Sequence, residues 1–207
     1  MVTEVRLYVE GGGDSKFTKD PIRKGFSGFL NDLVRCARRK GIRWSIIACG
    51  GREQTYDNFL LALRSHPEAL NVLLVDAEAP VLAPSWHHLR DHDGWPQPPG
   101  TRDEQCHLMV QNMEAWLIAD RAALERFYGA DFVAGALPSN PNVEQLDRAA
   151  MASGLARATQ RTKKGVYKKI QHGAALLEQV DPKVVRAAAP SCDRLFTTLA
   201  NERGGCP

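Results

Sequence analysis

Three acidic residues follow apolar, β-prone runs and are the side chains best suited to do chemistry. Glu10 ends the run TEVRLYVE, and Asp76 and Glu78 end the run NVLLVDAE. Mg²⁺ prefers carboxylate and water oxygens, and phosphodiester chemistry needs such a cation to offset phosphate charge and activate a water. In a strand, the spacing of Asp76 and Glu78 points both side chains to one side. We therefore predict a Mg²⁺ or Mn²⁺ site in which Asp76 and Glu78 hold the metal and Glu10 serves as a ligand or general acid/base.

Two further acids are candidates for the same pocket. Asp14 follows the glycine turn after Glu10, and Glu114 opens a helix just after a predicted strand. If that strand lies beside NVLLVDAE, Glu114 faces the pocket as a fourth metal ligand. The alternative for Glu114 is an acid that only complements the helix dipole. For the strand-end acids the alternative is a helix cap or a solvated turn.

A basic set of residues is the second candidate for function. The segment 157–172, RATQRTKKGVYKKIQH, contains no acid and carries a tyrosine among its cations. Lys and Arg supply most non-specific affinity for nucleic acid, and an aromatic ring can stack on an unpaired base. The alternative for this segment is a solvated helix face. Arg52, in the stretch GGR at 50–52, is a separate candidate phosphate contact, and the alternative there is a plain turn. The predicted nucleic-acid or phosphate contacts are Arg52, Lys163, Lys164, Tyr167, Lys168 and Lys169.

The elements that must position these residues alternate between strand and helix. This alternation predicts a mainly parallel sheet flanked by helices. Open sheets of this kind bind ligands beyond the carboxyl ends of their strands, where Glu10 and Asp76 stand. The expected order is a strand over 3–10, a helix over 26–40, a strand over 42–51, a helix over 52–65 and a strand over 71–78.

The second half of the chain is predicted to be mainly helical. An irregular insertion over 80–105 precedes a strand over 106–111 and a helix over 112–129. We expect an α/β domain over 1–140 and a helical C-terminal extension over 141–207 that packs on the same domain.

Composition agrees with a globular, cytoplasmic protein. The 207 residues are 43% hydrophobic and 25% charged, with a net charge of +3. The sequence contains no run of about 18 apolar residues, so we expect no membrane span. The N-terminal segment reads as a strand and not as a signal peptide.

Five pieces of the sequence resemble a Toprim-like family of bacterial proteins of unknown function, family number 4276. They cover most of the chain: YVEGGGD, LLVDAE, HLMVQNMEAWLIAD, ATQRTKKGVYKKIQH and CDRLF. The resemblance implies a Rossmann-like Toprim fold in which a Glu follows the first strand and an Asp-x-Asp motif follows a later one. These positions carry over to Glu10, Asp76 and Glu78. The sequence departs from the motif in having Glu78 at its last position, and the longer side chain changes the reach of the carboxylate.

The resemblance also implies an activity and partners. Toprim enzymes use these acids to bind Mg²⁺ while they cleave, join or prime nucleic acid, and related proteins are often encoded beside ATPases in phage-defence systems. The leading hypothesis is a Mg²⁺-dependent nuclease or related phosphodiester-processing enzyme. One alternative is a non-catalytic effector or binding subunit of an ATPase complex. Another is a phosphatase or nucleotide enzyme that uses the same acids on small molecules.

Overall fold

Four parallel strands form the centre of the computed structural model, which describes residues 2–13 and 15–201. Their order in the sheet is β2-β1-β3-β4, and each neighbouring pair is parallel. The prediction of an α/β fold with a parallel sheet flanked by helices is therefore confirmed, and a Toprim-like arrangement is compatible with it. Asp14 lies outside the described residues. The strands are β1 (Glu4–Glu10), β2 (Arg43–Gly50), β3 (Leu70–Asp76) and β4 (Cys106–Met109).

The sheet separates two apolar layers. Successive side chains of a strand point to opposite faces. In β3, accordingly, Val72 and Leu74 belong to one core cluster, and Leu73 belongs to the other. All seven residues of β3 are buried, as expected for a central strand covered on both faces.

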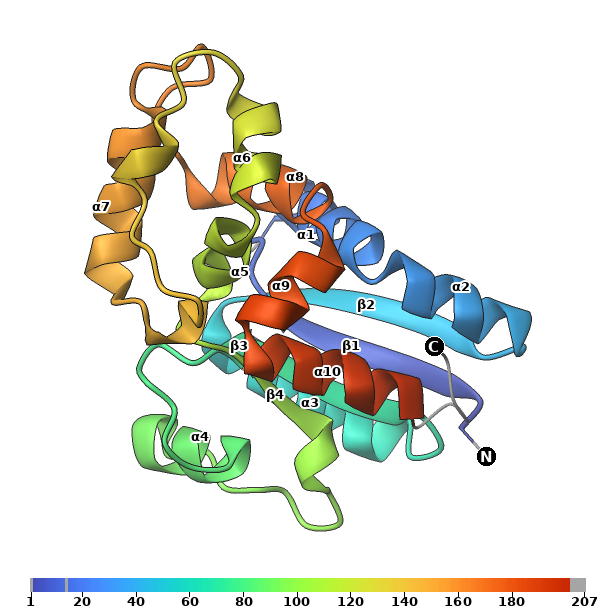
Figure 1. Ribbon diagram of the computed structural model, residues 1–207. Helices are drawn as coiled ribbons and strands as arrows, with labels where there is room; N and C mark the ends of the chain where they lie inside the picture. The colour runs from blue at the N-terminus through green and yellow to red at the C-terminus, as the bar shows by residue number, and fades with distance from the viewer. Residues whose placement is uncertain (1, 14, 202–207) are drawn as a thin grey trace.

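Helices cover both faces (Figure 1). One face packs against α1 (Lys16–Phe29), α2 (Asn31–Arg39) and α10 (Pro190–Asn201), and the other packs against α3 (Arg52–Ser65) and α4 (Ser85–Asp93). Trp86 and Leu89 of α4 are buried, so the predicted irregular insertion contains a packed helix.

The remaining helices lie towards the carboxyl ends of the strands and occupy the upper left and the centre of Figure 1. The cluster on the α1 side takes buried residues from both sides of the predicted boundary at residue 140. Gly25 of α1 allows a close approach to this part, because a Cβ there would lie 2.6 Å from the carbonyl oxygen of Ala174. The elements are α5 (Met113–Ala119), α6 (Arg121–Tyr128), α7 (Arg148–Thr159), a π-helical turn (Lys169–Gly173), α8 (Ala174–Leu177) and α9 (Pro182–Ala188). Three short 3₁₀ turns lie at Asp103–Gln105, Ala134–Ala136 and Val143–Gln145.

Two predicted helices are each divided in the structure. The helix expected over 26–40 is α1 followed by α2, with Leu30 between them, and α1 begins earlier because Ser15 caps it by accepting from Thr18 N. The helix expected over 112–129 breaks at Asp120. One carboxylate oxygen of Asp120 accepts from Ala123 N and caps α6, and the other accepts from Asp181 N. Side-chain caps from polar residues therefore set these boundaries.

Across residues 2–13 and 15–201, none of the helices combines the length and the apolar character that crossing a membrane requires.

Candidate functional site

Glu10 and Asp76 meet at the carboxyl edge of the sheet. Glu10 ends β1, Asp76 ends β3, and these strands are hydrogen-bonded neighbours. Glu10 Oε2 accepts a hydrogen bond of 3.1 Å from Asp76 N. The side chains are 17% and 4% exposed, respectively. The parallel register thus brings together two carboxylates that are far apart in the sequence.

Glu114 joins them from the first turn of α5. Asp76 Oδ1 accepts a hydrogen bond of 2.9 Å from Met113 N, which ties the start of α5 to the end of β3. Glu114 Oε1 accepts from the Tyr167 hydroxyl at 3.0 Å. The other oxygen, Oε2, is buried and has no hydrogen-bond partner among the described residues. The predicted fourth acid therefore lies beside Asp76 with one oxygen unused.

Glu78 takes a different position. β3 ends at Asp76, and Glu78 has a left-handed backbone with φ of 62°. Its carbonyl accepts from Arg148 Nη1 at 2.8 Å, and its Oε1 lies 3.8 Å from Arg148 Nη2. The chain has left the strand before Glu78, so the alternation of side chains in a strand no longer decides where Glu78 points. Joint binding of one ion by Asp76 and Glu78 stays a prediction.

Lys169 places an ammonium between two of the acids. Its Nζ lies 2.7 Å from Asp76 Oδ2 and 3.8 Å from Glu114 Oε2. The residue opens the π-helical turn, a type of distortion that often occurs at functional sites. Lys169 was predicted as a nucleic-acid contact, and its charge in this structure is directed into the acidic cluster.

Arg52, the first residue of α3, binds the same cluster from the other side. Its guanidinium makes two hydrogen bonds of 2.7 Å to Asp93 and one of 3.2 Å to Glu10 Oε2, and it also donates to the carbonyl oxygen of Asp76. Its carbon Cζ lies 5.1 Å from the centroid of the Trp95 ring. With protein acceptors on three sides, Arg52 holds Glu10 and the end of β3 in place.

The charges in the cluster shift the pKa values of its members. Burial raises the pKa of Glu10, the nearby charge of Asp76 raises it further, and Arg52 offsets part of the effect. Burial opposes the charged form of Lys169, but the charges of Asp76 and Glu114 outweigh it and raise the pKa of Lys169. Glu10 therefore holds a proton more readily than an exposed glutamate does.

A small cavity opens beside these groups. Its volume is about 170 Å³, and its lining includes Glu10, Asp76, Lys169, Ile170 and the glycine turn at 11–13. The turn is closed by reciprocal backbone hydrogen bonds between Gly11 and Gly50. The cavity therefore gives solvent access to two carboxylates and one ammonium.

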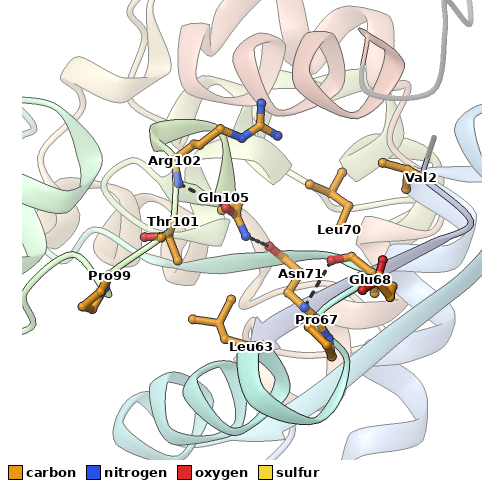
Figure 2. Close-up of a pocket in the computed structure, with 12 residues that line it drawn as sticks. Val2, Leu63, Pro67, Glu68, Leu70, Asn71, Pro99, Thr101, Arg102 and Gln105 are labelled. Carbon is orange, nitrogen blue, oxygen red and sulfur yellow. Dashed lines mark hydrogen bonds between the residues drawn. The ribbon is translucent and has the colours of Figure 1, made fainter.

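A larger hollow of about 410 Å³ lies at the opposite edge of the sheet. Figure 2 shows Asn71 and Gln105 joined there by a hydrogen bond, between the start of β3 and the segment before β4. None of the acids predicted for the metal site lines this hollow. We assign the candidate site by its chemistry and not by cavity size.

The basic segment divides into two groups. Lys163, Lys164 and Lys168 are exposed, whereas Tyr167 directs its hydroxyl to Glu114. Lys164 Nζ lies 4.8 Å from the centroid of the Phe127 ring. Contacts of these lysines, Tyr167 and Arg52 with nucleic acid stay predictions.

Sequence reasoning missed two members of the site. Asp93 binds Arg52 through both carboxylate oxygens, and Arg148 pairs with Glu78. Asp93 lies in the insertion over 80–105 that was predicted to be irregular, and Arg148 opens a helix in the C-terminal part. No spacing pattern links either residue to its partner.

The residues present fit a divalent cation in their chemistry. The carboxylates outnumber the cations four to two, with Glu10, Asp76, Asp93 and Glu114 facing Arg52 and Lys169. This excess of negative charge and the unused oxygen of Glu114 suit a hard cation. As the side chains stand, no group of three or more His, Cys, Asp or Glu among the described residues is gathered closely enough to hold a metal ion.

Comparisons with known proteins give one match. Residues 9–200 match the family described as a domain of unknown function (DUF4276). No curated protein and no solved structure matches the chain.

Proposed function

The chain belongs to the DUF4276 family, and from that premise and the acidic cluster we propose that it is a divalent-cation-dependent enzyme that cleaves or otherwise processes phosphodiester bonds in nucleic acid. The observation that carries the proposal is the contact of Glu10 with Asp76 at the carboxyl edge of a parallel sheet, with Glu114 linked to Asp76 through Lys169. Ligand sites in open parallel sheets lie at this edge.

Asp76 and Glu114 would hold Mg²⁺ or Mn²⁺, Glu78 is a further candidate ligand, and Glu10 would serve either as a ligand or as the general acid/base. When bound, such a cation offsets the charge of a phosphate and lowers the pKa of a coordinated water. Tyr167 orients Glu114, and Arg52 orients Glu10, through the hydrogen bonds described above. Each carboxylate is thus held by a protein donor before any substrate arrives.

Glu10 is the candidate general acid/base. In the cation-free protein, burial and the Asp76 charge raise the pKa of Glu10, so its carboxylate holds a proton more readily than an exposed glutamate does. Glu10 Oε2 already accepts from Asp76 N and Arg52. Arg52 keeps this oxygen in place while the carboxylate gains or loses a proton.

The size of the cavity favours a polymer over a free nucleotide. Its volume of about 170 Å³ is small beside the roughly 300–1,000 Å³ typical of small-molecule sites. A phosphate group can enter while the rest of the substrate stays on the surface. The exposed Lys163, Lys164 and Lys168 would neutralise neighbouring phosphates.

A cleavage assay tests the proposal. The purified protein is incubated with supercoiled plasmid, single-stranded DNA and RNA in Mg²⁺, in Mn²⁺ or in a chelator. We expect cleavage of at least one polymer that requires the cation and falls by roughly 100-fold in Glu10→Gln and Asp76→Asn. Glu4→Gln is the matched control, because Glu4 also lies on β1 and also binds arginines, but at the other end of the strand. It should change the rate by less than about twofold.

Two results would contradict the proposal. Cleavage that is unchanged in Glu10→Gln and Asp76→Asn would place the activity elsewhere. Stable binding of nucleic acid without cleavage in either cation would favour the alternative, a non-catalytic binding subunit of a complex such as one with an ATPase.

A further inference from the structure

The ammonium of Lys169 lies between the carboxylates of Asp76 and Glu114. It is 2.7 Å from Asp76 Oδ2 and 3.8 Å from Glu114 Oε2. The second distance is too long for a hydrogen bond, and Glu114 Oε2 has no hydrogen-bond partner among the described residues. Lys169 therefore neutralises the two acids but leaves one of the available oxygens unsatisfied.

The backbone around Lys169 is anchored. Tyr167 N donates to Thr159 Oγ1 at 2.8 Å, and His172 N donates to the carbonyl of Lys168 at 2.8 Å. Gly173 packs tightly, because a Cβ there would lie 3.0 Å from Met113 Cε. The position of the π-helical turn is thus fixed by contacts that do not involve the Lys169 side chain.

The side chain itself has room to move. It is 49% exposed, and the next residue, Ile170, is 65% exposed. Both residues line the cavity that holds Glu10 and Asp76. A lysine has a flexible four-carbon stem, so its ammonium can leave Asp76 for the mouth of the cavity while the backbone stays in place.

We propose that Lys169 takes the place of the divalent cation between Asp76 and Glu114 in the cation-free protein, and that cation binding displaces its ammonium to the cavity mouth, where it binds a phosphate of the substrate. This inference rests on the proposed function, since it needs a cation at the acidic cluster. It assigns Lys169 a role apart from the exposed lysines of the same segment.

Cation binding tests the first half of the inference without any activity measurement. Mn²⁺ is titrated by calorimetry into chelator-treated wild-type protein, Lys169→Met and Lys169→Arg. We expect Lys169→Met to bind Mn²⁺ about three- to tenfold more tightly, because the cation no longer has to break a half-exposed ion pair. Lys169→Arg keeps the competing charge and should bind no more tightly than wild type.

Lys168→Met is the matched control. It removes the same charge one residue earlier, from a side chain that makes no ion pair within residues 2–13 and 15–201. Its Mn²⁺ affinity should stay within about twofold of wild type. Thermal unfolding in chelator checks that each variant is folded, and Lys169→Gln serves as a second neutral variant.

The results separate the two proposals. Wild-type binding of Mn²⁺ with no gain in Lys169→Met and Lys169→Gln would overturn the role of Lys169 and leave the proposed function standing. No binding of Mn²⁺ by wild type or by either neutral variant would overturn both.

Binding of a single-stranded DNA oligonucleotide in Mn²⁺ tests the second half. Loss of one phosphate contact should reduce the slope of log affinity against log salt by about 0.7 in Lys169→Met. The same variant would then bind the cation more tightly and the oligonucleotide more weakly. An unchanged salt slope would overturn the transfer of Lys169 to phosphate.

Discussion

The two ends of β1 each carry a glutamate, but the charged neighbours of the two glutamates differ. At the amino end, Glu4 accepts hydrogen bonds of 2.8 Å from Arg6 and 2.9 Å from Arg43. At the carboxyl end, Glu10 accepts from Arg52 but lies beside a second carboxylate, Asp76. The two glutamates are shielded to a similar degree, with 12% and 17% of their side chains exposed. Their charged neighbours therefore distinguish them better than burial does.

The same contrast extends across the sheet. At the amino edge of the sheet, where the strands begin, Arg194 donates to the carbonyls of Cys106 and Asp103, while Asn71 Oδ1 is buried without a hydrogen-bond partner among the described residues. The carboxyl edge also has a buried oxygen without a hydrogen bond among the described residues, Glu114 Oε2, but it differs in bringing the like charges of Glu10 and Asp76 together. Clusters of like-charged groups that reduce the stability of the fold are typical of functional sites. The comparison separates a structural edge from a candidate active edge.

Acid should weaken the amino edge through His107. Its side chain is buried, with Nε2 donating to the carbonyl of Glu104 and Nδ1 accepting from Arg194. Burial, with the charge of Arg194, lowers the pKa of His107 from 6.5 to about 3. The unfolded chain binds this proton near pH 6.5 and the folded protein does not, so stability falls as pH drops from 6.5 towards 3. At pH 5 the loss should be about 2 kcal/mol.

Chemical denaturation of wild type and His107→Gln between pH 7 and 5 measures this effect. The variant should lose about 2 kcal/mol less than wild type over that interval, whatever its stability at pH 7. Identical pH dependence of the two proteins would show that His107 is not kept neutral in the folded protein.

Replacing Arg194 should change the free energy of unfolding by less than the effect of acid on His107. Its guanidinium joins α10 to the start of β4 through bonds of 2.9 Å to the Cys106 carbonyl and 2.6 Å to the Asp103 carbonyl. Arg194→Met leaves both carbonyls to weaker partners and should lower the free energy of unfolding by about 1–1.5 kcal/mol at pH 7. Arg90→Met, which removes an exposed ion pair with Asp91, is the control and should leave the free energy of unfolding close to that of wild type. Equal losses in the two variants would mean that the amino edge gains nothing from Arg194.

Much of the sheet could be predicted from the sequence. The continuous apolar run of NVLLVDAE indicates a strand covered on both faces, and β3 is buried along its length. The alternation of strand and helix places Glu10 and Asp76 at one edge, and the register of β1 and β3 confirms their proximity. Residues at the carboxyl ends of strands can be placed from the sequence because a parallel sheet brings these ends to one edge.

The partners of these acids could not be predicted in the same way. Lys169 lies 93 residues after Asp76 in the sequence, and Arg52 lies 41 residues before Asp93. Their pairing depends on how α3, α4 and the C-terminal part pack, and no local pattern encodes that. The composition of 157–172 predicted a basic surface, but only the fold shows that the half-exposed Lys169 pairs with Asp76, whereas Lys168 makes no ion pair among the described residues.

The smallest expected changes in the free energy of unfolding come from replacing the glutamates at the two ends of β1. Burial and the Asp76 charge raise the pKa of Glu10 above its usual 4.5, so its ionised form destabilises the fold at pH values above the raised pKa. Glu10→Gln keeps an oxygen that can accept from Asp76 N and Arg52, and it removes the charge. We expect it to raise the free energy of unfolding at pH 7 by a few tenths to about 1 kcal/mol. The gain should disappear as pH falls below 4.5, where both states of wild type carry the proton.

Glu4→Gln should have the opposite sign. It weakens the ion pairs with Arg6 and Arg43, and since Arg43 is 75% exposed the loss at pH 7 should stay below about 1 kcal/mol. Denaturant titrations at pH 7 and pH 4 measure the free energy of unfolding of Glu10→Gln and Glu4→Gln. If Glu10→Gln were as destabilising as Glu4→Gln, the charge of Glu10 would be satisfied in the fold. The carboxyl edge would then be another structural edge, and the case for a cation site there would lose its electrostatic basis.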